Sequence, residues 1–198
     1  MEIRGTGSYL PGKIITNDDL SEVVDTNDEW ISSRTGICQR HISEGETTSE
    51  MAARAAVVAL EDAEVSPEEV ELIIVATMTG DGAMPGTACK VQKEIGAVHA
   101  ACFDLSAACT GFVFALNTAN AYLASGMYRN ALVIGADMVS KVIDWTDRAT
   151  CVLFGDGAGA VFVRADNTKR YVAVTGSDGQ KGDVLQAGRI PLKNLLVK

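Results

Sequence analysis

The chain has 198 residues, of which 47% are hydrophobic, so it is long enough to bury the core of a globular domain. It carries 26 acidic against 17 basic residues, and the resulting net charge of −9 repels a phosphate backbone and argues against nucleic-acid binding. Its apolar runs are shorter than the roughly 18 residues of a spanning helix and its N-terminus does not resemble a secretory leader, so we expect a cytoplasmic protein without a membrane partner.

Helix-start signals and glycine-rich stretches organise the first half of the chain. Capping-box patterns that predict helices or helical turns occur at Thr26 with Glu29, at Thr47 with Glu50, and at Ser66 with Pro67 and Glu69. Apolar spacing predicts a long helix over 49–63 and a second one over 87–96. The stretch "GTGSYLPG" at 5–12 is typical of a loop.

Short apolar runs bounded by Gly, Asp or Asn predict strands that are covered on both faces. They are "ELIIVAT" at 71–77, "ACFDLSA" at 101–107, "NALVIGADM" at 130–138 and "ATCVLFGDGAGAVFV" at 149–163. Their alternation with helices predicts an α/β fold. The "GDGAGA" at 155–160 leads into an apolar run and not a helix, so it indicates a tight turn between strands and not a phosphate-binding loop. Charged and turn residues at 164–170 mark the candidate domain boundary.

The five cysteines form an odd set without a C-x-x-C pair, and the two histidines, His41 and His99, lie far from any ligand-like cluster. Neither a disulfide framework nor a zinc site is therefore expected. We expect four of the cysteines to be small hydrophobic residues of the core, because free cysteine favours buried positions. These four are Cys38, Cys89, Cys102 and Cys151.

Cys109 stands between a predicted strand and the helical pattern of 110–126, which ends at Gly126, a typical helix C-cap. The N–H groups and the dipole of a helix N-terminus favour a thiolate there, and small neighbours leave room for a substrate carbonyl. Position alone supports a nucleophile and a buried thiol about equally. If Cys109 is a nucleophile, acyl exchange suits it, since attack on a thioester yields another thioester. The helix lacks charged residues and is apolar on more than one face, so we expect it to need cover from elsewhere.

Several ordered stretches resemble a known family. "GTGSYLPGKIITNDDL", "DTNDEWISSRTGI", "FDLSAACTGF" and "DWTDRATCVLFGDGAGA" are similar to the β-ketoacyl-[acyl-carrier-protein] synthase III family, the initiating condensing enzymes of bacterial type II fatty-acid synthesis. The resemblance covers the whole chain and implies the N-terminal portion of a thiolase-like, layered α-β-α-β-α fold. It implies that residues 1–165 form the half that carries the nucleophile. Residues 166–198 would form a connecting strand and loop at the start of a C-terminal half whose remainder is absent.

The resemblance also assigns candidate site residues. Cys109 matches the nucleophile of the family. Trp30 and Arg148 match a pair that sandwiches the adenine of coenzyme A, and Thr26 and Arg34 match positions that contact the coenzyme. A departure concerns the acyl pocket. Where many members carry a phenylalanine that reaches across the dimer to close this pocket, the chain has Met84, so the primer preference does not follow from the resemblance.

The implied reaction moves an acetyl or short acyl group from acyl-CoA to the cysteine. Malonyl-acyl carrier protein then loses carbon dioxide and attacks this group, which gives a β-ketoacyl product. The implied partners are these two substrates and a second copy of the chain, with coenzyme A thioester as a substrate, no permanently bound cofactor and no metal. Neither histidine of the chain matches the catalytic histidine of the family. Two alternatives stay open: another thiolase-fold acyl-CoA synthase or transferase, and a non-catalytic half that serves as a partner subunit.

Overall fold

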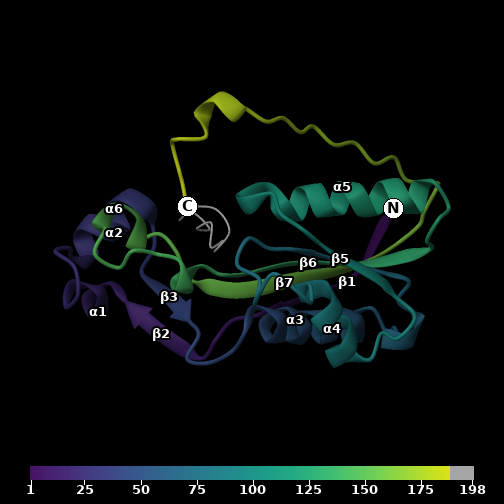
Figure 1. Ribbon diagram of the computed structural model, residues 1–198, viewed down its shortest axis with the longest axis horizontal. Helices are drawn as coiled ribbons and strands as arrows, with labels where there is room; N and C mark the ends of the chain where they lie inside the picture. The colour runs from purple at the N-terminus through teal and green to yellow at the C-terminus, as the bar shows by residue number, and fades with distance from the viewer. Residues whose placement is uncertain (188–198) are drawn as a thin grey trace, which may run out of the picture.

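The structure is a computed structural model that describes residues 1–187; the end of the expected connecting segment, 188–198, lies outside the described residues. Within the described part, five strands form one mixed sheet in the order β1-β7-β6-β4-β5 (Figure 1). β4 pairs in parallel with β5 and β6, whereas β7 pairs antiparallel with β6 and β1. The strands are β1 (Glu2–Tyr9), β4 (Leu72–Ala76), β5 (Ala101–Leu105), β6 (Asn130–Met138) and β7 (Asp156–Arg164).

Helices cover both faces of this sheet. α3 (Thr48–Asp62) and α4 (Thr87–Ile95) lie on one face, and α5 (Gly111–Ala124) lies on the other (Figure 1). The expected α/β class is confirmed, and the arrangement supplies an α-β-α set of layers of the thiolase-like fold. Of the helices in residues 1–187, none has the length and hydropathy needed to cross a membrane.

The central strand β4 shows why the apolar runs form this sheet. All five of its residues are buried. Because side chains alternate along a strand, Ile73 and Val75 pack into the core beneath α3 and α4, whereas Leu72 and Ile74 pack into the core beneath α5. A strand with a core on each side reads as an uninterrupted apolar run, as the sequence predicts here.

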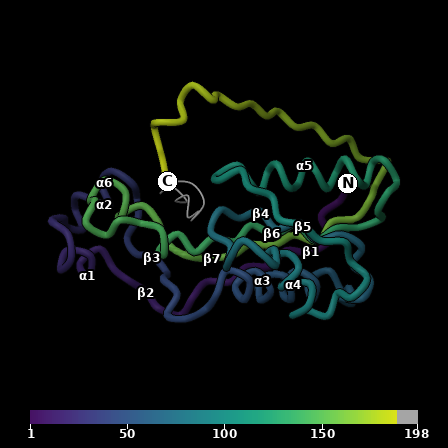
Figure 2. The backbone as a smooth tube through the Cα atoms, viewed as in Figure 1, coloured from purple at the N-terminus to yellow at the C-terminus, as the bar shows by residue number. Residues whose placement is uncertain are grey.

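A smaller lobe lies beyond the end of the sheet where β6 finishes and β7 begins. It contains the antiparallel pair β2 (Lys13–Thr16) and β3 (Gln39–Ile42) and the helices α1 (Asn17–Ser21), α2 (Asp28–Thr35) and α6 (Arg148–Cys151). Figure 2 shows that its purple and blue N-terminal segments lie beside the green segment of α6, although well over 100 residues separate them. Their contact forms a separate hydrophobic cluster around Leu20, Ile31, Cys151 and Val152.

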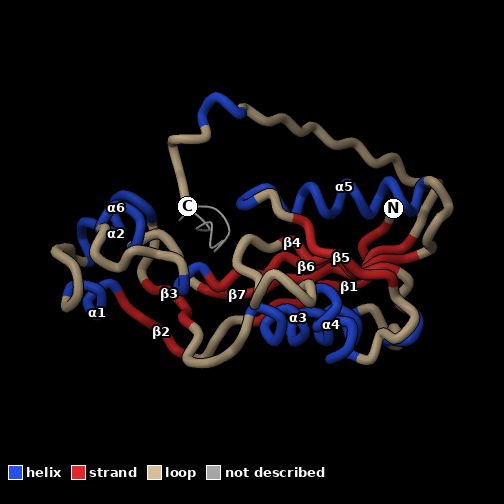
Figure 3. Tube along the Cα trace, in the orientation of Figure 1, coloured by secondary structure: helices blue, strands red, loops and turns tan. Residues whose placement is uncertain are grey.

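Beyond β7 the chain runs along the outer side of α5 (tan in Figure 3). Tyr171 donates a hydrogen bond to Asn117 of that helix, and a single 3-10 turn follows at Gly179–Lys181. In the described part of the expected connecting segment, residues 166–187, the structure has no strand. α5 itself buries one stripe against the sheet, while Val113 on another face is 48% exposed. That other elements cover this face remains a prediction.

Four local expectations are wrong. The glycine-rich 5–12 stretch is mostly strand β1 and not a loop, and "GDGAGA" lies within β7 apart from Gly155, so it is not a tight turn. The 149–163 run is not one strand either, because α6 precedes β7. Finally, α2 is capped by Asn27 and not Thr26, since the Asn27 carboxamide accepts the Trp30 N–H at 2.7 Å.

The glycines of β1 serve packing. A Cβ on Gly7 would stand 2.2 Å from the Ala55 carbonyl oxygen and 2.4 Å from the Ala59 nitrogen, both in α3. Only glycine therefore lets β1 lie this close to α3, and this tertiary contact overrides the loop preference of the local sequence.

We expect Gly7→Ala to lower the free energy of unfolding by about 1–3 kcal/mol, the usual cost of an overpacked core. Gly12→Ala is the matched control, because a Cβ at Gly12 meets nothing within 4 Å. It should shift the free energy by less than about 0.5 kcal/mol. Urea unfolding followed by circular dichroism measures both, and equal midpoints for the two variants would contradict the packing role.

Candidate functional site

Cys109 lies at the strand-to-helix junction that the sequence predicts. β5 ends at Leu105, a 3-10 turn spans Ala108–Thr110, and α5 begins at Gly111. Cys109 is exposed. The residue before it, Ala108, has a φ of 45°, in the left-handed region that non-glycine residues rarely adopt. Strained backbone of this kind persists where the surrounding structure enforces it and is frequent at functional sites.

The start of α5 is pressed against the sheet. A Cβ on Gly111 would lie 3.2 Å from the Cβ of Ala76 at the end of β4, so this position favours glycine. The hydroxyl of Thr110 donates to the Ala107 carbonyl at 2.9 Å, and among the described residues no side chain caps α5. The Thr110 and Gly111 N–H groups donate to the Ala107 and Ala108 carbonyls, so the 3-10 turn itself uses the N–H groups that follow the thiol.

The loop that carries Met84 connects β4 to α4, and Met84 is 87% exposed. Two carboxylates hold its ends. Asp137 of β6 accepts hydrogen bonds from the Met78 and Thr79 N–H groups, at 2.9 and 3.1 Å. At the other end, Asp104 of β5 accepts the N–H groups of Thr87 and Ala88, the first residues of α4, at 2.6 Å each. The sequence analysis missed both carboxylates, although an acidic residue inside an apolar strand run is a usable signal.

In the smaller lobe, α2 places Trp30 and Arg34 one helical turn apart. The Arg34 guanidinium carbon lies 4.6 Å from the centroid of the Trp30 ring, and that of Arg148, the first residue of α6, lies 4.7 Å from it. Arg148 also donates to the Asp25 carbonyl at 3.0 Å. Next to Asp25, the buried Thr26 hydroxyl has no hydrogen-bond partner among the described residues. The four residues predicted for coenzyme contact therefore come from two segments that the fold brings to one place.

A buried guanidinium supports this lobe from inside. Arg40 of β3 donates to the Ile15 carbonyl at 3.2 Å, to the Asn17 side-chain oxygen at 2.8 Å and to the Val152 carbonyl at 3.2 Å. Burial lowers the pKa of Arg40 below its usual value. Burial, helped by the charge of Asp147, raises the pKa of the thiol of Cys151, the last residue of α6. Nothing in the local sequence around Arg40 predicts its burial, because its partners are distant in the chain.

The remaining cysteines do not all follow expectation. Cys151 is buried, as predicted, and Cys102 is half-buried. The prediction that Cys38 and Cys89 are core residues is wrong, because both are exposed: Cys38 follows α2, and Cys89 lies in the first turn of α4.

The two histidines lie in other surroundings. The Nδ1 atom of His41, in β3, is 2.6 Å from the Pro11 carbonyl and donates to it, and His99 is exposed in a turn before β5.

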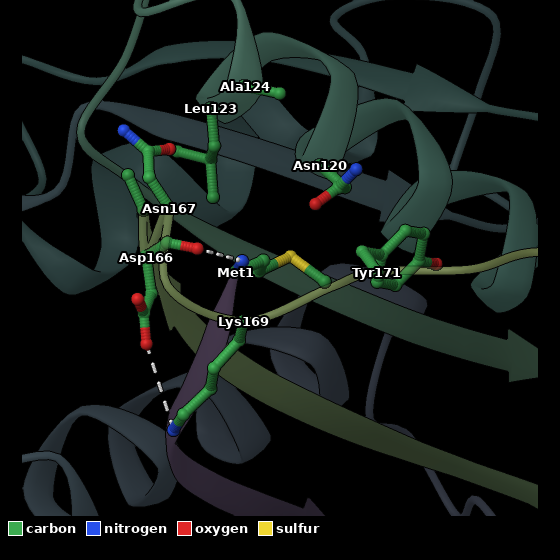
Figure 4. A pocket seen from close by; sticks show the side chains of 9 residues that line it. Met1, Asn120, Leu123, Ala124, Asp166, Asn167, Lys169 and Tyr171 are labelled. Atoms are coloured by element: carbon green, nitrogen blue, oxygen red, sulfur yellow. Dashed lines mark hydrogen bonds and ion pairs between the residues drawn. The ribbon is translucent and has the colours of Figure 1, made fainter.

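A cavity of about 270 Å³ lies at the other end of α5 from Cys109 (Figure 4). It is bounded by the N-terminus, the last turns of α5 and the segment after β7. The Met1 ammonium donates to the Asp166 carbonyl at 3.0 Å, and Lys169 lies 3.8 Å from the Asp166 carboxylate. Because this cavity lies at the opposite end of α5 from the Cys109 thiol, it is not the acyl pocket.

Comparison with known proteins agrees with the geometry. Residues 103–179 match the family described as 3-oxoacyl-[acyl-carrier-protein] synthase III. The β-ketoacyl-[acyl-carrier-protein] synthase III of Clostridium acetobutylicum is 58% identical over 186 residues, which are 93% of this chain and 57% of that protein.

Two crystal structures of 3-oxoacyl-[acyl-carrier-protein] synthase III have the same fold. The one from Aquifex aeolicus VF5 is 52% identical with a TM-score of 0.82, over 84% of this chain and 54% of that one. The one from Pseudomonas aeruginosa PAO1 is 43% identical with a TM-score of 0.88, over 96% of this chain and 60% of that one. The chain thus spans less than two thirds of these relatives. Sequence motifs, fold and the setting of Cys109 together show that the chain belongs to the β-ketoacyl-[acyl-carrier-protein] synthase III family.

Proposed function

We propose that the chain supplies the acyl-accepting and coenzyme-binding part of an initiating condensing enzyme. Cys109 takes an acetyl or short acyl group from acyl-CoA, and malonyl-acyl carrier protein then condenses with this group and releases carbon dioxide. The observation that carries the proposal is the exposed thiol of Cys109 at a strand-to-helix junction, directly after the strained Ala108 and at the N-terminal end of α5.

In the first step the Cys109 thiolate attacks the carbonyl carbon of the acyl-CoA thioester. The carbonyl oxygen becomes an oxyanion at the N-terminal end of α5, where the positive end of the helix dipole favours negative charge. Collapse of this intermediate breaks the bond to the coenzyme sulfur, which leaves as a thiolate and takes up a proton. One thioester replaces another, so the acyl group keeps its reactivity for the second step.

Coenzyme binding is proposed for the smaller lobe. Arg34 and Arg148 place two positive charges on the Trp30 ring in a chain whose net charge is −9, and a coenzyme carries negatively charged phosphates. Arg148 lies only 4.7 Å from the ring centroid, whereas an adenine between the two needs about 7 Å, twice the separation of contacting carbon atoms. Binding of the adenine therefore requires the Arg148 guanidinium to move away from the Trp30 ring and to break its hydrogen bond to the Asp25 carbonyl.

We propose that condensation needs groups beyond those described. His41 is hydrogen-bonded to the Pro11 carbonyl, and His99 lies in an exposed turn. Neither therefore supplies the catalytic histidine that the family resemblance implies. We also propose a homodimer. β5 is an edge strand, and its outer side has no neighbouring strand in the described part of the chain, which suits pairing with a second copy.

The proposal predicts that acetyl-CoA acylates Cys109 and no other cysteine. Peptide mapping after incubation with labelled acetyl-CoA locates the label. Cys109→Ser should reduce labelling to background while coenzyme A still binds, and Cys38→Ser, which removes another exposed thiol, should leave labelling unchanged. Label on another cysteine with Cys109 unmodified would refute the assignment. A coenzyme-binding chain without acylation would favour a non-catalytic partner subunit.

Trp30→Ala should weaken coenzyme A binding by about 1–3 kcal/mol, the usual worth of a base stacked on an aromatic ring. Trp30→Phe keeps an aromatic ring at this position and should therefore lose less coenzyme A affinity than Trp30→Ala. Isothermal titration calorimetry measures the affinities, and circular dichroism checks that the variants fold. An unchanged dissociation constant for Trp30→Ala would show that the ring serves the core of the lobe only.

The flexible thioether side chain of Met84 should admit primers somewhat longer than acetyl, because methionine adapts its shape. Met84→Phe should narrow the range toward acetyl. Rates of Cys109 acylation by a series of acyl-CoA primers measure this. Met127→Phe, at an exposed methionine just after α5, is the matched control. A strict acetyl preference that Met84→Phe does not alter would exclude a role for Met84 in primer choice.

A further inference from the structure

Two cysteines outside the proposed acyl site lie in contact. Cys89 is in the first turn of α4 and Cys102 is the second residue of β5, and their Sγ atoms are 3.3 Å apart. Cys89 is exposed and Cys102 is half-buried. We propose that Cys89 and Cys102 form a redox-active dithiol, which a low-molecular-weight disulfide such as oxidised glutathione converts reversibly into an intrachain disulfide.

The surrounding structure holds the two sulfur atoms in place. Asp104, two residues after Cys102, accepts the N–H groups of Thr87 and Ala88, which directly precede Cys89, at 2.6 Å each. Helix and strand are thus fixed to each other beside the thiols. A disulfide bond of about 2.0 Å requires the sulfurs to approach by about 1.3 Å from their present separation.

The two thiols have different reactivity. Burial, together with a hydrogen bond to Cys89, raises the pKa of Cys102 to about 11. At neutral pH Cys102 therefore carries much less thiolate than an ordinary cysteine, whose pKa is about 8.5. The greater intrinsic nucleophilicity of a high-pKa thiolate offsets only part of this difference, so Cys102 attacks an external disulfide more slowly than an ordinary exposed thiol does. The exposed Cys89 therefore reacts first.

The exchange proceeds in two balanced steps. The Cys89 thiolate attacks one sulfur of oxidised glutathione, and one glutathione leaves with the electron pair and takes up a proton. Cys102 then loses its proton and attacks the Cys89 sulfur, which expels the second glutathione as a thiol. The protein dithiol loses two electrons and two protons, and the glutathione disulfide gains them. Once Cys89 is in the mixed disulfide it no longer carries the charge that opposes ionisation of Cys102.

The bond would connect two elements that border the proposed acyl site. α4 follows the loop of Met84, and β5 leads into the turn of Cys109. The dithiol itself does not depend on acyl transfer, so its test stands apart from that of the proposed function.

The native chain is incubated with oxidised glutathione, alkylated, and digested without reduction. We expect one peptide that links Cys89 to Cys102, an intact monomer mass lower by two hydrogens, and full reversal by dithiothreitol. Two free, alkylated cysteines at these positions, a link between two chains, or a link to Cys38 or Cys109 would overturn the proposal. In urea the chain is unfolded and no longer holds Cys89 next to Cys102. Oxidation there should no longer favour the link between these two cysteines over links between other cysteines.

Single variants test the order of attack. Cys102→Ser should trap one glutathione on the exposed Cys89, whereas Cys89→Ser should acquire it more slowly on Cys102, which is half-buried. Cys38→Ser is the matched control at an exposed cysteine and should keep the link between Cys89 and Cys102. Faster reaction at Cys102 than at Cys89 would overturn the assignment of Cys89 as the attacking thiol.

Discussion

The buried carboxylate of Asp156 joins the two parts on which the candidate site depends. It is 4% exposed and accepts hydrogen bonds from the Ser43 N–H at 2.8 Å, the Ser140 N–H at 2.9 Å and the Ser140 hydroxyl at 2.6 Å. These donors come from the segment after β3 and the segment after β6. Because a buried carboxylate without partners costs several kcal/mol, the folded state keeps donors from both segments beside it. The carboxylate thus fixes the lobe of Trp30 against the end of the sheet.

Where a pattern is local, the sequence predicts the fold well. The 130–138 run is β6 to the residue, and the Thr47 and Glu50 capping box starts α3. The predictions for the glycine-rich stretches are wrong because contacts with residues distant in the sequence decide the conformation of these stretches. Gly7 meets the backbone of α3, and Gly155 meets the backbone of His41, at 2.9 Å from a Cβ placed there. Glycine in these stretches permits close packing of a strand. From the neighbouring residues alone, the same glycines predict a turn or a loop.

The same distinction applies to the candidate site. The junction at Cys109 follows from adjacent small residues and a helical pattern, so the sequence predicts its structure directly. The contact between Trp30 and Arg148 spans more than 100 residues and came from the family resemblance alone. The supporting groups Asp104 and Arg40 were missed, because the carbonyl and N–H groups that they bind are brought to them only by the folded backbone.

The stack around Trp30 shows how a site can be ordered and yet open easily. A cation over an exposed aromatic ring is worth about 0.5–1 kcal/mol, and a single hydrogen bond such as that from Arg148 to Asp25 adds about 1 kcal/mol. A base stacked on the ring contributes about 1–3 kcal/mol, and the displaced guanidinium can stack on its other side. If coenzyme A binds here as proposed, exchange of Arg148 for its adenine is close to balanced before the phosphates bind. Arg34, held by the Trp30 carbonyl at 3.2 Å, keeps a positive charge beside the ring throughout, so the arrangement favours an anionic ligand with an aromatic base over a neutral one.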